Sequence, residues 1–566
     1  MKTMKKYILM FMVGCLGLMT SCIGDLDTMP LDDNNLVTEK VYSSKEGYMG
    51  VLAKCYASLI LTGQQGGDGG DGDLEGANEG YSGYTRLLFY LQEQCTDNFL
   101  MPSSSNGLRN CLNLNWDATT SVVTWTYQRL YMSIAYCNEF LRECTPEKMQ
   151  ERGVWNDMSA DYLNYRAEAR FIRAYCYSML CDLYGNVPII DESVGVKDVP
   201  VQKTRKEVFE YAERELKSIL GENGSTDELL KKSRQNEYGR VDEVAAWFLL
   251  ARLYLNAEVY AGEARYADCL TYADKIIQGG DYPLASDYRH IFLADNETCS
   301  EIIWPLVQDG DHAQSSAGTN FYVKAFVNGP MDELYQTGVG SRGWGNVRSK
   351  TTLVDAFDPA DVAFDTNDTW GNGKNDKRAQ FMTALTAEDG TPQTKETWDA
   401  NLAMTSTFTC GYGYIKWRNV NKNDDPADEA YTSIDWPMFR TADAYLMAAE
   451  AILRVGGDRN KALGYVNEVR MRAYMSDDYG TNAVSGKITD GELTLDFILD
   501  ERQRELASEC VRRTDLIRFD KFTKGNNWDW KNGDRLGSDV DDIYNLFPIP
   551  ESELTNNPTL VQNDGY

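Results

Sequence analysis

The sequence predicts a mainly α-helical protein, in which degenerate helix pairs form a scaffold that carries long loops and short strands. Apolar and small residues recur at helical spacing in several segments of the 566-residue chain. The stretch 247–254 (WFLLARLY) has the spacing of the first helix of a tetratricopeptide repeat. By contrast, residues 281–435 are rich in Gly, Asn, Asp, Thr and Trp and keep no helical period, which indicates loops and short strands.

Several helices are expected in the N-terminal half of the chain. Each is predicted from small and apolar residues that share one face at 3.6 residues per turn. The second of them ends at Gly185, and Pro188 follows soon after, which is a typical helix stop. The predicted ranges are 125–141, 162–184, 206–220, 241–259 and 266–277.

Helices return in the C-terminal part of the chain, at 441–455, 462–474 and 493–508. The range 462–474 contains Ala462 and Val466 at the spacing of the second helix of a tetratricopeptide repeat. The spacing between repeats drifts from the usual value of about 34 residues, so the repeats are degenerate, and any amphipathic helix pair would look similar. Repeats of this kind build a concave scaffold, which usually binds rather than catalyses.

The first residues predict export and a lipid anchor. Residues 2–6 contain three lysines, and the apolar run 7–20 is shorter than the roughly 20 residues that span a bilayer. The ending 18–22 (LMTSC) resembles a bacterial lipobox, in which the signal 1–21 is removed and Cys22 is acylated. Two aspartates follow closely, which resembles the surface-export signal of Bacteroidetes lipoproteins. An ordinary cleaved signal is the alternative.

The charge of the chain argues against several classes of function. Asp and Glu number 86 against 56 Lys and Arg, and the formal net charge of -30 repels nucleic acid. The two histidines, His290 and His312, are too few for a histidine-rich metal site or for most Ser-His and Cys-His catalysis. Carboxylate pairs occur by chance in a chain this acidic, and none is marked by a glycosidase motif, so we predict no enzyme.

The 13 cysteines are expected to be small buried side chains, with a disulfide framework as the alternative. Cys15 falls in the signal and Cys22 is the acylated residue, which leaves 13 − 2 = 11, an odd number. Several of the others, including Cys137 and Cys176, fall on apolar helical stretches. The chain contains no Cys-x-x-Cys pair, so metal binding by thiolates is not expected.

Stretches along the whole chain resemble the SusD/RagB family of outer-membrane nutrient-binding lipoproteins. They run from the lipobox to the last residue and keep the order of the family. One departure is Cys510-Val511, where the family usually has Gly-Arg before Arg512. The other matching stretches are 167–174 (AEARFIRA), 184–188 (YGNVP), 239–241 (GRV), 245–246 (AA), 250–252 (LAR), 435–440 (DWPMFR), 449–451 (AEA), 467–473 (NEVRMRA), 515–519 (DLIRF), 547–550 (FPIP) and 562–566 (QNDGY).

The resemblance implies a SusD-like fold with a helical tetratricopeptide scaffold. It also predicts how the chain is divided into regions. The signal peptide 1–21 precedes an N-terminal helical region, 22–280, which carries a ligand-facing loop at 61–106. The C-terminal region, 281–566, is expected to be loop-rich to residue 435, helical over 436–522 and then to end in a tail.

The resemblance also implies a cell-surface protein that is lipid-anchored in the outer membrane. Such a protein captures oligosaccharide or polysaccharide and delivers it to a SusC-like TonB-dependent transporter. The N-terminal third is most similar to starch-binding members, so a starch-type α-glucan is one candidate ligand. Another glycan (fructan, host or plant glycan) and an oligopeptide are the alternatives. No catalysis, cofactor or nucleic-acid partner is implied.

Sugar binding needs exposed aromatic rings, together with side chains that donate and accept hydrogen bonds in plane. Starch-binding members of the family carry an arc of rings. By position, Trp344 matches one ring, and Phe321 matches a second, with its neighbour Tyr322 as a substitute. In the third part of the arc, the starch-binding members have tryptophans at positions where this sequence has Met101 and Ser103, so the predicted arc is incomplete.

Three polar residues complete the expected ligand site. Asn106 and Arg86 match a hydrogen-bonding Asn and Arg of the starch-binding relatives, and Asn78 replaces an Asp. Structural roles are the alternatives: the Phe321 ring can belong to the core, and Arg86 can pair with Glu79.

The acidic loop 66–76 gives a weak calcium candidate. Asp71, Asp73 and Glu75 stand at the first, third and fifth positions of a loop like that of an EF-hand. The twelfth position is Ser82 rather than Glu, and no helix pair flanks the loop. A flexible acidic turn is the alternative.

Overall fold

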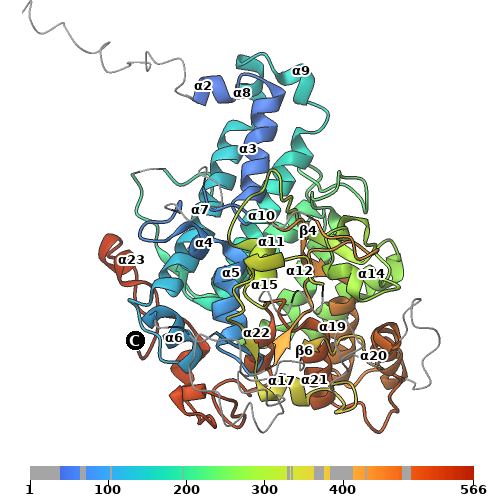
Figure 1. Ribbon diagram of the computed structural model, residues 1–566. Coiled ribbons are helices and arrows are strands. Elements are labelled where there is room, and N and C mark those ends of the chain that lie inside the picture. The colour runs from blue at the N-terminus through green and yellow to red at the C-terminus, as the bar shows by residue number, and fades with distance from the viewer. Residues whose placement is uncertain are drawn as a thin grey trace, which may run out of the picture.

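A computed structural model provides the structure of the protein (Figure 1). The residues that the structure describes are 38–63, 72–101, 103, 105–195, 197–327, 332, 336–362, 375–382, 412–427, 430–474 and 486–566. The predicted signal peptide, Cys22, Asp71 and the side chain of Asn106 lie outside the described part.

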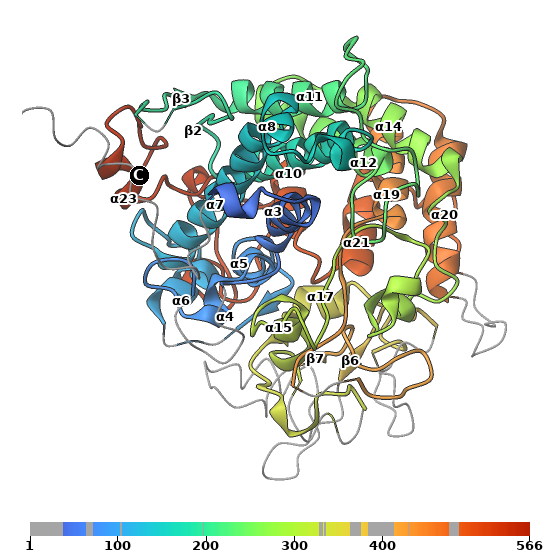
Figure 2. The same ribbon diagram turned by 90° about the horizontal axis from the view of Figure 1, so that it is seen from above.

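The scaffold is a series of long helices, each of which packs against the next. Seen from above, these helices form an arc that runs from α7 to α20 and leaves the loop-rich segments on the opposite side (Figure 2). The helices of the arc are α7 (Ser121–Glu143), α10 (Tyr162–Leu183), α11 (Arg205–Ile219), α12 (Glu243–Leu255), α14 (Tyr266–Gly279), α19 (Thr441–Arg454) and α20 (Arg459–Tyr474).

The pair α12 and α14 shows how the sequence builds this arc. Asp242 caps the start of α12, because its carboxylate accepts the backbone N–H groups of Val244 and Ala245. Leu250 and Ala251, in the tetratricopeptide-like stretch, are fully buried, and α14 packs against this helix. Since α14 also packs against α19, it joins the N-terminal and C-terminal parts of the chain.

Shorter elements surround the arc. The N-terminal helices are α2 (Thr38–Val41), α3 (Lys45–Ala57), α4 (Glu79–Ser82), α5 (Tyr84–Leu88), the π-helix η1 (Phe89–Gln94), α6 (Asn106–Asn113), α8 (Pro146–Glu151), α9 (Trp155–Met158) and α13 (Ala257–Ala261). Later in the chain come η2 (Arg289–Phe292), η3 (Asn296–Thr298), α15 (Gly318–Lys324), η4 (Gly340–Arg342), α17 (Thr351–Asp355), α21 (Leu495–Leu506), α22 (Arg512–Arg518), η5 (Lys531–Gly533), η6 (Asp542–Asn545) and α23 (Glu551–Asn556).

The strands of the described residues form four two-stranded antiparallel sheets. The largest joins two strands of five residues each that lie far apart in the sequence. The sheets pair β1 (Phe99–Leu100) with β5 (Arg348–Ser349), β2 (Val187–Pro188) with β3 (Gln202–Lys203), β4 (Ile302–Leu306) with β8 (Trp436–Arg440), and β6 (Phe381–Met382) with β7 (Gly413–Tyr414).

The predicted fold class is confirmed. The helices expected from periodicity are present as the members of the arc and as α21, and the strands are short. The described part of the loop-rich segment also holds short helices that were not predicted, of which α15 is important for the site. Its seven residues are too few to show a helical period in the sequence.

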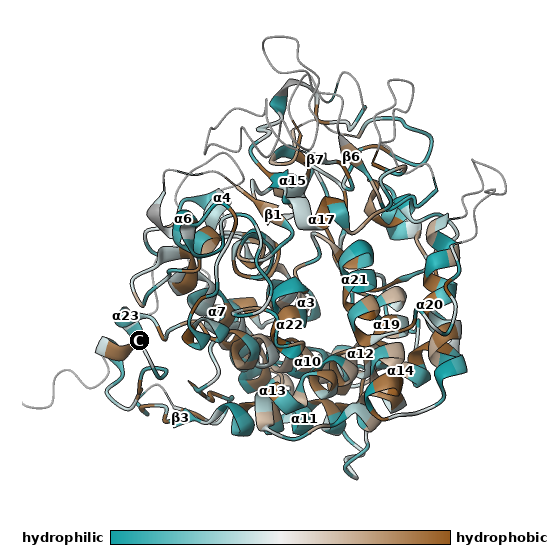
Figure 3. Ribbon diagram, turned by 90° about the horizontal axis from the view of Figure 1, so that it is seen from below, coloured by the Kyte–Doolittle hydropathy of each residue, from teal (hydrophilic) through white to brown (hydrophobic). Residues whose placement is uncertain are grey.

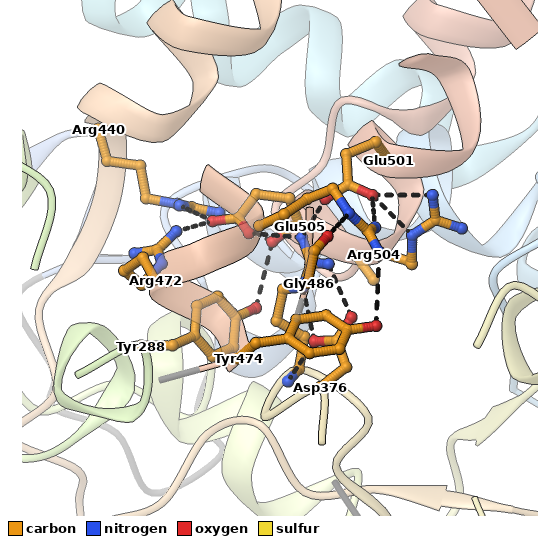
Figure 4. A network of polar contacts seen from close by, with 12 residues as sticks. Tyr288, Asp376, Arg440, Arg472, Tyr474, Gly486, Glu501, Arg504 and Glu505 are labelled. Carbon is orange, nitrogen blue, oxygen red and sulfur yellow. Dashed lines mark hydrogen bonds and ion pairs between the residues drawn. The ribbon is translucent and has the colours of Figure 1, made fainter. Parts of the chain in front are cut away.

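A buried network of ion pairs joins the loop-rich segment to the C-terminal helices (Figure 4). Glu505 on α21 accepts a hydrogen bond from Arg440 on β8 at 2.7 Å and also pairs with Arg472 on α20. Arg378 donates to Glu501 at 2.7 Å and to Glu505 at 3.0 Å. Burial alone would raise the pKa of Glu505, but the surrounding arginines lower this pKa to about 2. Because removal of one partner from a buried pair costs about 3–5 kcal/mol, the network fixes β8, α20 and α21 relative to one another.

The cysteines of the described residues behave as small core side chains. Ten of them are buried and free. Cys510, at the departure from the family pattern, has φ +61°, in the left-handed region where glycine is the usual residue. Its backbone N–H donates to Glu93 at 2.7 Å, so the tertiary contact holds this conformation.

Hydrophobic (brown) and hydrophilic (teal) residues occur together on the helices of the arc (Figure 3). Within the described part of the chain, no helix combines the length and the low polarity that a membrane span requires.

Candidate functional site

Three segments that are distant in sequence meet to form the candidate ligand site. They are the α4–α5 segment, the segment 315–324 that contains α15, and the loop that follows η4. Glu79 of α4 fastens the first two, because its buried carboxylate accepts hydrogen bonds from Thr62 Oγ1 at 2.5 Å, Ser315 Oγ at 2.7 Å and the Ser316 N–H at 3.2 Å. Glu79 is therefore held by hydroxyl and amide donors, and the alternative pairing with Arg86 is not formed.

Two glycines allow these segments to approach so closely. A Cβ atom on Gly83 would lie 2.0 Å from the Cβ of Ala317, and one on Gly80 would lie 3.0 Å from Arg86 Nη1 and 3.1 Å from Ser316 Cβ. Gly83 has φ −72°, which every residue can adopt, so its requirement for glycine is one of space and not of backbone conformation.

The guanidinium of Arg86 lies at the centre of a cluster of aromatic rings. Its Cζ is 4.1 Å from the ring centroid of Tyr81, 4.8 Å from that of Phe321 and 5.6 Å from that of Trp344. Its Nε donates to the Tyr90 hydroxyl at 2.8 Å. Its two terminal nitrogens have no acceptor among the described residues, although Arg86 itself is buried, with 5 % exposure.

Trp344 provides the exposed ring of the site. The residue is 40 % exposed, although its backbone N–H is fixed by a hydrogen bond of 2.6 Å to the Lys324 carbonyl at the end of α15. Its ring centroid lies 6.4 Å from that of Phe321. An exposed ring on a fixed backbone can stack on an apolar ligand face without much loss of entropy.

The other aromatic candidates lie below the surface. Phe321 is fully buried beneath Arg86, and Tyr322 is fully buried with its hydroxyl donating to the Thr85 carbonyl at 2.8 Å. Met101 is also a core residue, with 4 % exposure. Only Trp344 of the predicted rings therefore reaches the surface in this structure.

Of the remaining polar candidates, the structure places only Asn78 beside the site. Asn78 is exposed and caps α4, since its side-chain oxygen accepts the Gly80 N–H at 3.0 Å. Asn106 begins α6. Tyr81 was missed by the sequence reasoning, because no motif marks it and only its contact with Arg86 reveals it.

Of the calcium candidates that the structure describes, Asp73 uses its carboxylate in an ion pair, whereas the contact of Glu75 is made by its backbone. Both carboxylate oxygens of Asp73 face Arg129, at 2.7 Å for Oδ2. The backbone carbonyl of Glu75 accepts from Trp125 Nε1 at 3.3 Å. Among the described residues, no group of three His, Cys, Asp or Glu side chains is arranged to hold a metal ion.

Comparison with known proteins places the chain among relatives of this architecture. Residues 300–566 match the model of the SusD family, and residues 74–255 match a family described as "Starch-binding associating with outer membrane". Over 97 % of this chain and 96 % of the relative, the sequence is 34 % identical to the starch-binding protein SusD of Bacteroides thetaiotaomicron. The chain belongs to the SusD family. It is also 25 % identical, over 75 % of its length and 81 % of the relative, to the SusD-like protein P25 of Formosa agariphila.

Solved structures of the SusD superfamily share the fold. A SusD-like protein from Bacteroides fragilis has a TM-score of 0.67 at 20 % identity, and the match covers 95 % of this chain and 100 % of that one. The surface glycan-binding protein A from Bacteroides thetaiotaomicron, solved in complex with laminarihexaose, has a TM-score of 0.62 at 20 % identity, with 92 % and 99 % coverage. At 20 % identity, these two structures show that the fold is shared and show nothing about the ligand of this chain.

Proposed function

We propose that this protein binds an oligosaccharide or polysaccharide at the cell surface and delivers it to a SusC-like TonB-dependent transporter. The observation that carries the binding proposal is the exposed Trp344 ring beside the Arg86 guanidinium, whose terminal N–H groups are unused among the described residues. A ring face suits the C–H face of a sugar, and N–H donors suit its hydroxyl edge. The starch-binding relative, which aligns over nearly the whole chain, supports the same class of ligand.

Each candidate residue has a defined part in this proposal. Trp344 stacks on the sugar, and Arg86 donates hydrogen bonds to its hydroxyl groups. Asn78 adds a polar contact on the rim, and Asn106 remains a candidate from the family resemblance. Phe321 acts from below, since its buried ring supports the guanidinium of Arg86. The buried Tyr322 and Met101 shape the floor of the site.

A starch-type α-glucan is the first ligand to test, because of the starch-binding relative. The second candidate is another glycan, such as a fructan or a host or plant glycan. It is favoured by Met101, a buried methionine that, by the family resemblance, stands where starch-binding members carry a tryptophan. An oligopeptide is the remaining outcome. We propose no catalytic role.

The same proposal includes the location of the protein. Acylation of Cys22 would anchor it in the outer membrane with the folded part on the cell surface. The family description that names the outer membrane supports this location. Co-purification of the full-length lipoprotein with a large outer-membrane β-barrel tests delivery to a transporter.

Calorimetric titration tests the binding site. The chain from residue 23 onward, which retains every described residue, is titrated with starch, levan, mannan, xylan, pectin and mucin glycans. For the glycan that binds, Trp344→Ala should weaken binding at least tenfold, which is about 1.4 kcal/mol. Trp155→Ala on α9 is the matched control and should leave the affinity unchanged. Equal affinities of the two variants would contradict the site. If no glycan of the panel gave measurable binding heat, a peptide ligand would be favoured.

A further inference from the structure

A second polar cavity lies between α17 and the loop that contains η5. Its volume is about 340 Å³, which is within the range of small-ligand pockets, about 300–1,000 Å³. One wall comes from α17 and includes Thr352 and Asp355, and the other comes from residues 527–529 and 535–536. It shares no residue with the cluster around Arg86.

The fold leaves hydrogen-bonding groups unused around this cavity. The Thr352 hydroxyl, the Asn527 amide and the Arg535 guanidinium make no hydrogen bond with any described residue. Asp529 is held in place, because its Oδ2 accepts from the backbone N–H of Thr351 at 3.1 Å and from the hydroxyl of Thr351 at 2.7 Å. Its Oδ1 accepts no hydrogen bond from the described part of the chain. The cavity therefore presents donors and acceptors that the protein does not satisfy itself.

The cavity also has an apolar side. Leu536 lines it and is 73 % exposed, the largest exposure among the described large apolar residues. Trp528 lines it as well, with a buried ring whose Nε1 has no hydrogen-bond partner among the described residues. An unsatisfied buried donor is unfavourable by about 1–3 kcal/mol.

We propose that this cavity is a second saccharide-binding site, for a neutral stretch of glycan. A sugar would place an apolar C–H face on Leu536 and direct its hydroxyl edges to Thr352, Asn527 and Asp529. The Asp529 carboxylate and the Arg535 guanidinium have opposite charges, so the lining has no excess of cations that would select an anionic ligand. The net charge of -30 acts in the same direction.

The two sites are close enough for one glycan chain to occupy both. Trp344 and Thr351 are separated by 351 − 344 = 7 residues, a span of at most about 25 Å of extended backbone. A polymer that bridges both sites gains affinity, because its second contact is intramolecular. A trisaccharide is short enough to occupy each site separately, whereas a polymer is long enough to reach both. The identity of the glycan rests on the proposed function, whereas the cavity and its unused groups do not.

The test compares a trisaccharide with a polymer, using the chain from residue 23 onward. The probes are maltotriose and soluble starch, or the trisaccharide and polymer of whichever glycan in the panel gives heat. The wild type should bind two trisaccharides per chain. The double variant N527A/R535A should bind one, at unchanged affinity, and its affinity for the polymer should fall at least tenfold. Thr352→Trp fills the cavity from the opposite wall and should have the same effect.

The controls separate this inference from the proposed function. The double variant N460A/R214A alters exposed side chains on α20 and α11. It should change neither the number of trisaccharides bound per chain nor the affinity for the polymer. Unfolding by denaturant checks that each variant is folded. One trisaccharide per wild-type chain, with polymer affinity unchanged in both cavity variants, would overturn the second site and leave the function standing. If no glycan bound to the wild type, both the second site and the proposed glycan-binding function would be refuted.

Discussion

Gly83→Ala should destabilise the protein and weaken glycan binding together, because Gly83 lies where the α4–α5 segment meets Ala317. A Cβ there would be 2.0 Å from the Cβ of Ala317, whereas ordinary contact begins at 3.4 Å, so the two segments must separate by about 1.4 Å (3.4 − 2.0). Overpacking of this kind costs about 1–3 kcal/mol. The separation also draws Arg86 away from Phe321, which lies across the junction. We expect the affinity of the bound glycan to fall at least tenfold.

Denaturant unfolding and calorimetric titration measure the two effects on the same samples. Gly50→Ala is the matched control, since Gly50 lies inside helix α3 and a Cβ there meets nothing within 4 Å. That variant should be unchanged or more stable by up to about 1 kcal/mol. Ala317→Gly in the Gly83→Ala background should restore both stability and binding, because it removes the clashing atom. If Gly83→Ala were as stable as Gly50→Ala, or if Ala317→Gly gave no rescue, the close approach inferred here would be wrong.

Three further predictions concern stability, and denaturant unfolding measures each. Glu505→Gln should lower the free energy of unfolding by about 3–5 kcal/mol, because it leaves buried arginines without their charged partner. Glu210→Gln, in an exposed ion pair, is the control and should change this free energy by less than about 1 kcal/mol. Arginines hold the pKa of Glu505 at about 2 against burial, so the stabilisation from this network is present above the ordinary carboxylate range and should be lost as the pH falls toward 2. A stability that did not change over this pH range would contradict the network. Cys510→Gly should keep or raise stability, because φ is +61°, whereas the β-branched Cys510→Val should lower it; the reverse order would show that the backbone is not strained.

Local sequence patterns were sufficient to predict the helical scaffold. Periodicity and stop signals located α10 and α12 within a few residues, because their apolar faces and end residues are local properties. The short helix α15 was not predicted, since seven residues do not establish a period. The sheet between β4 and β8 was not predicted either, because partners more than a hundred residues apart leave no local pattern.

The sequence by itself determined the class of the protein, and it supplied Arg86 and Trp344 as separate candidates for the site. Only the tertiary structure decided which rings reach the surface. Phe321 and Tyr322 are buried because α15 packs both of them inward against neighbouring aromatic rings, and Tyr81 enters the site because α4 folds over Arg86. Exposure depends on segments that are distant in sequence and meet only on folding, whereas residue identity and helical period are properties of each segment alone.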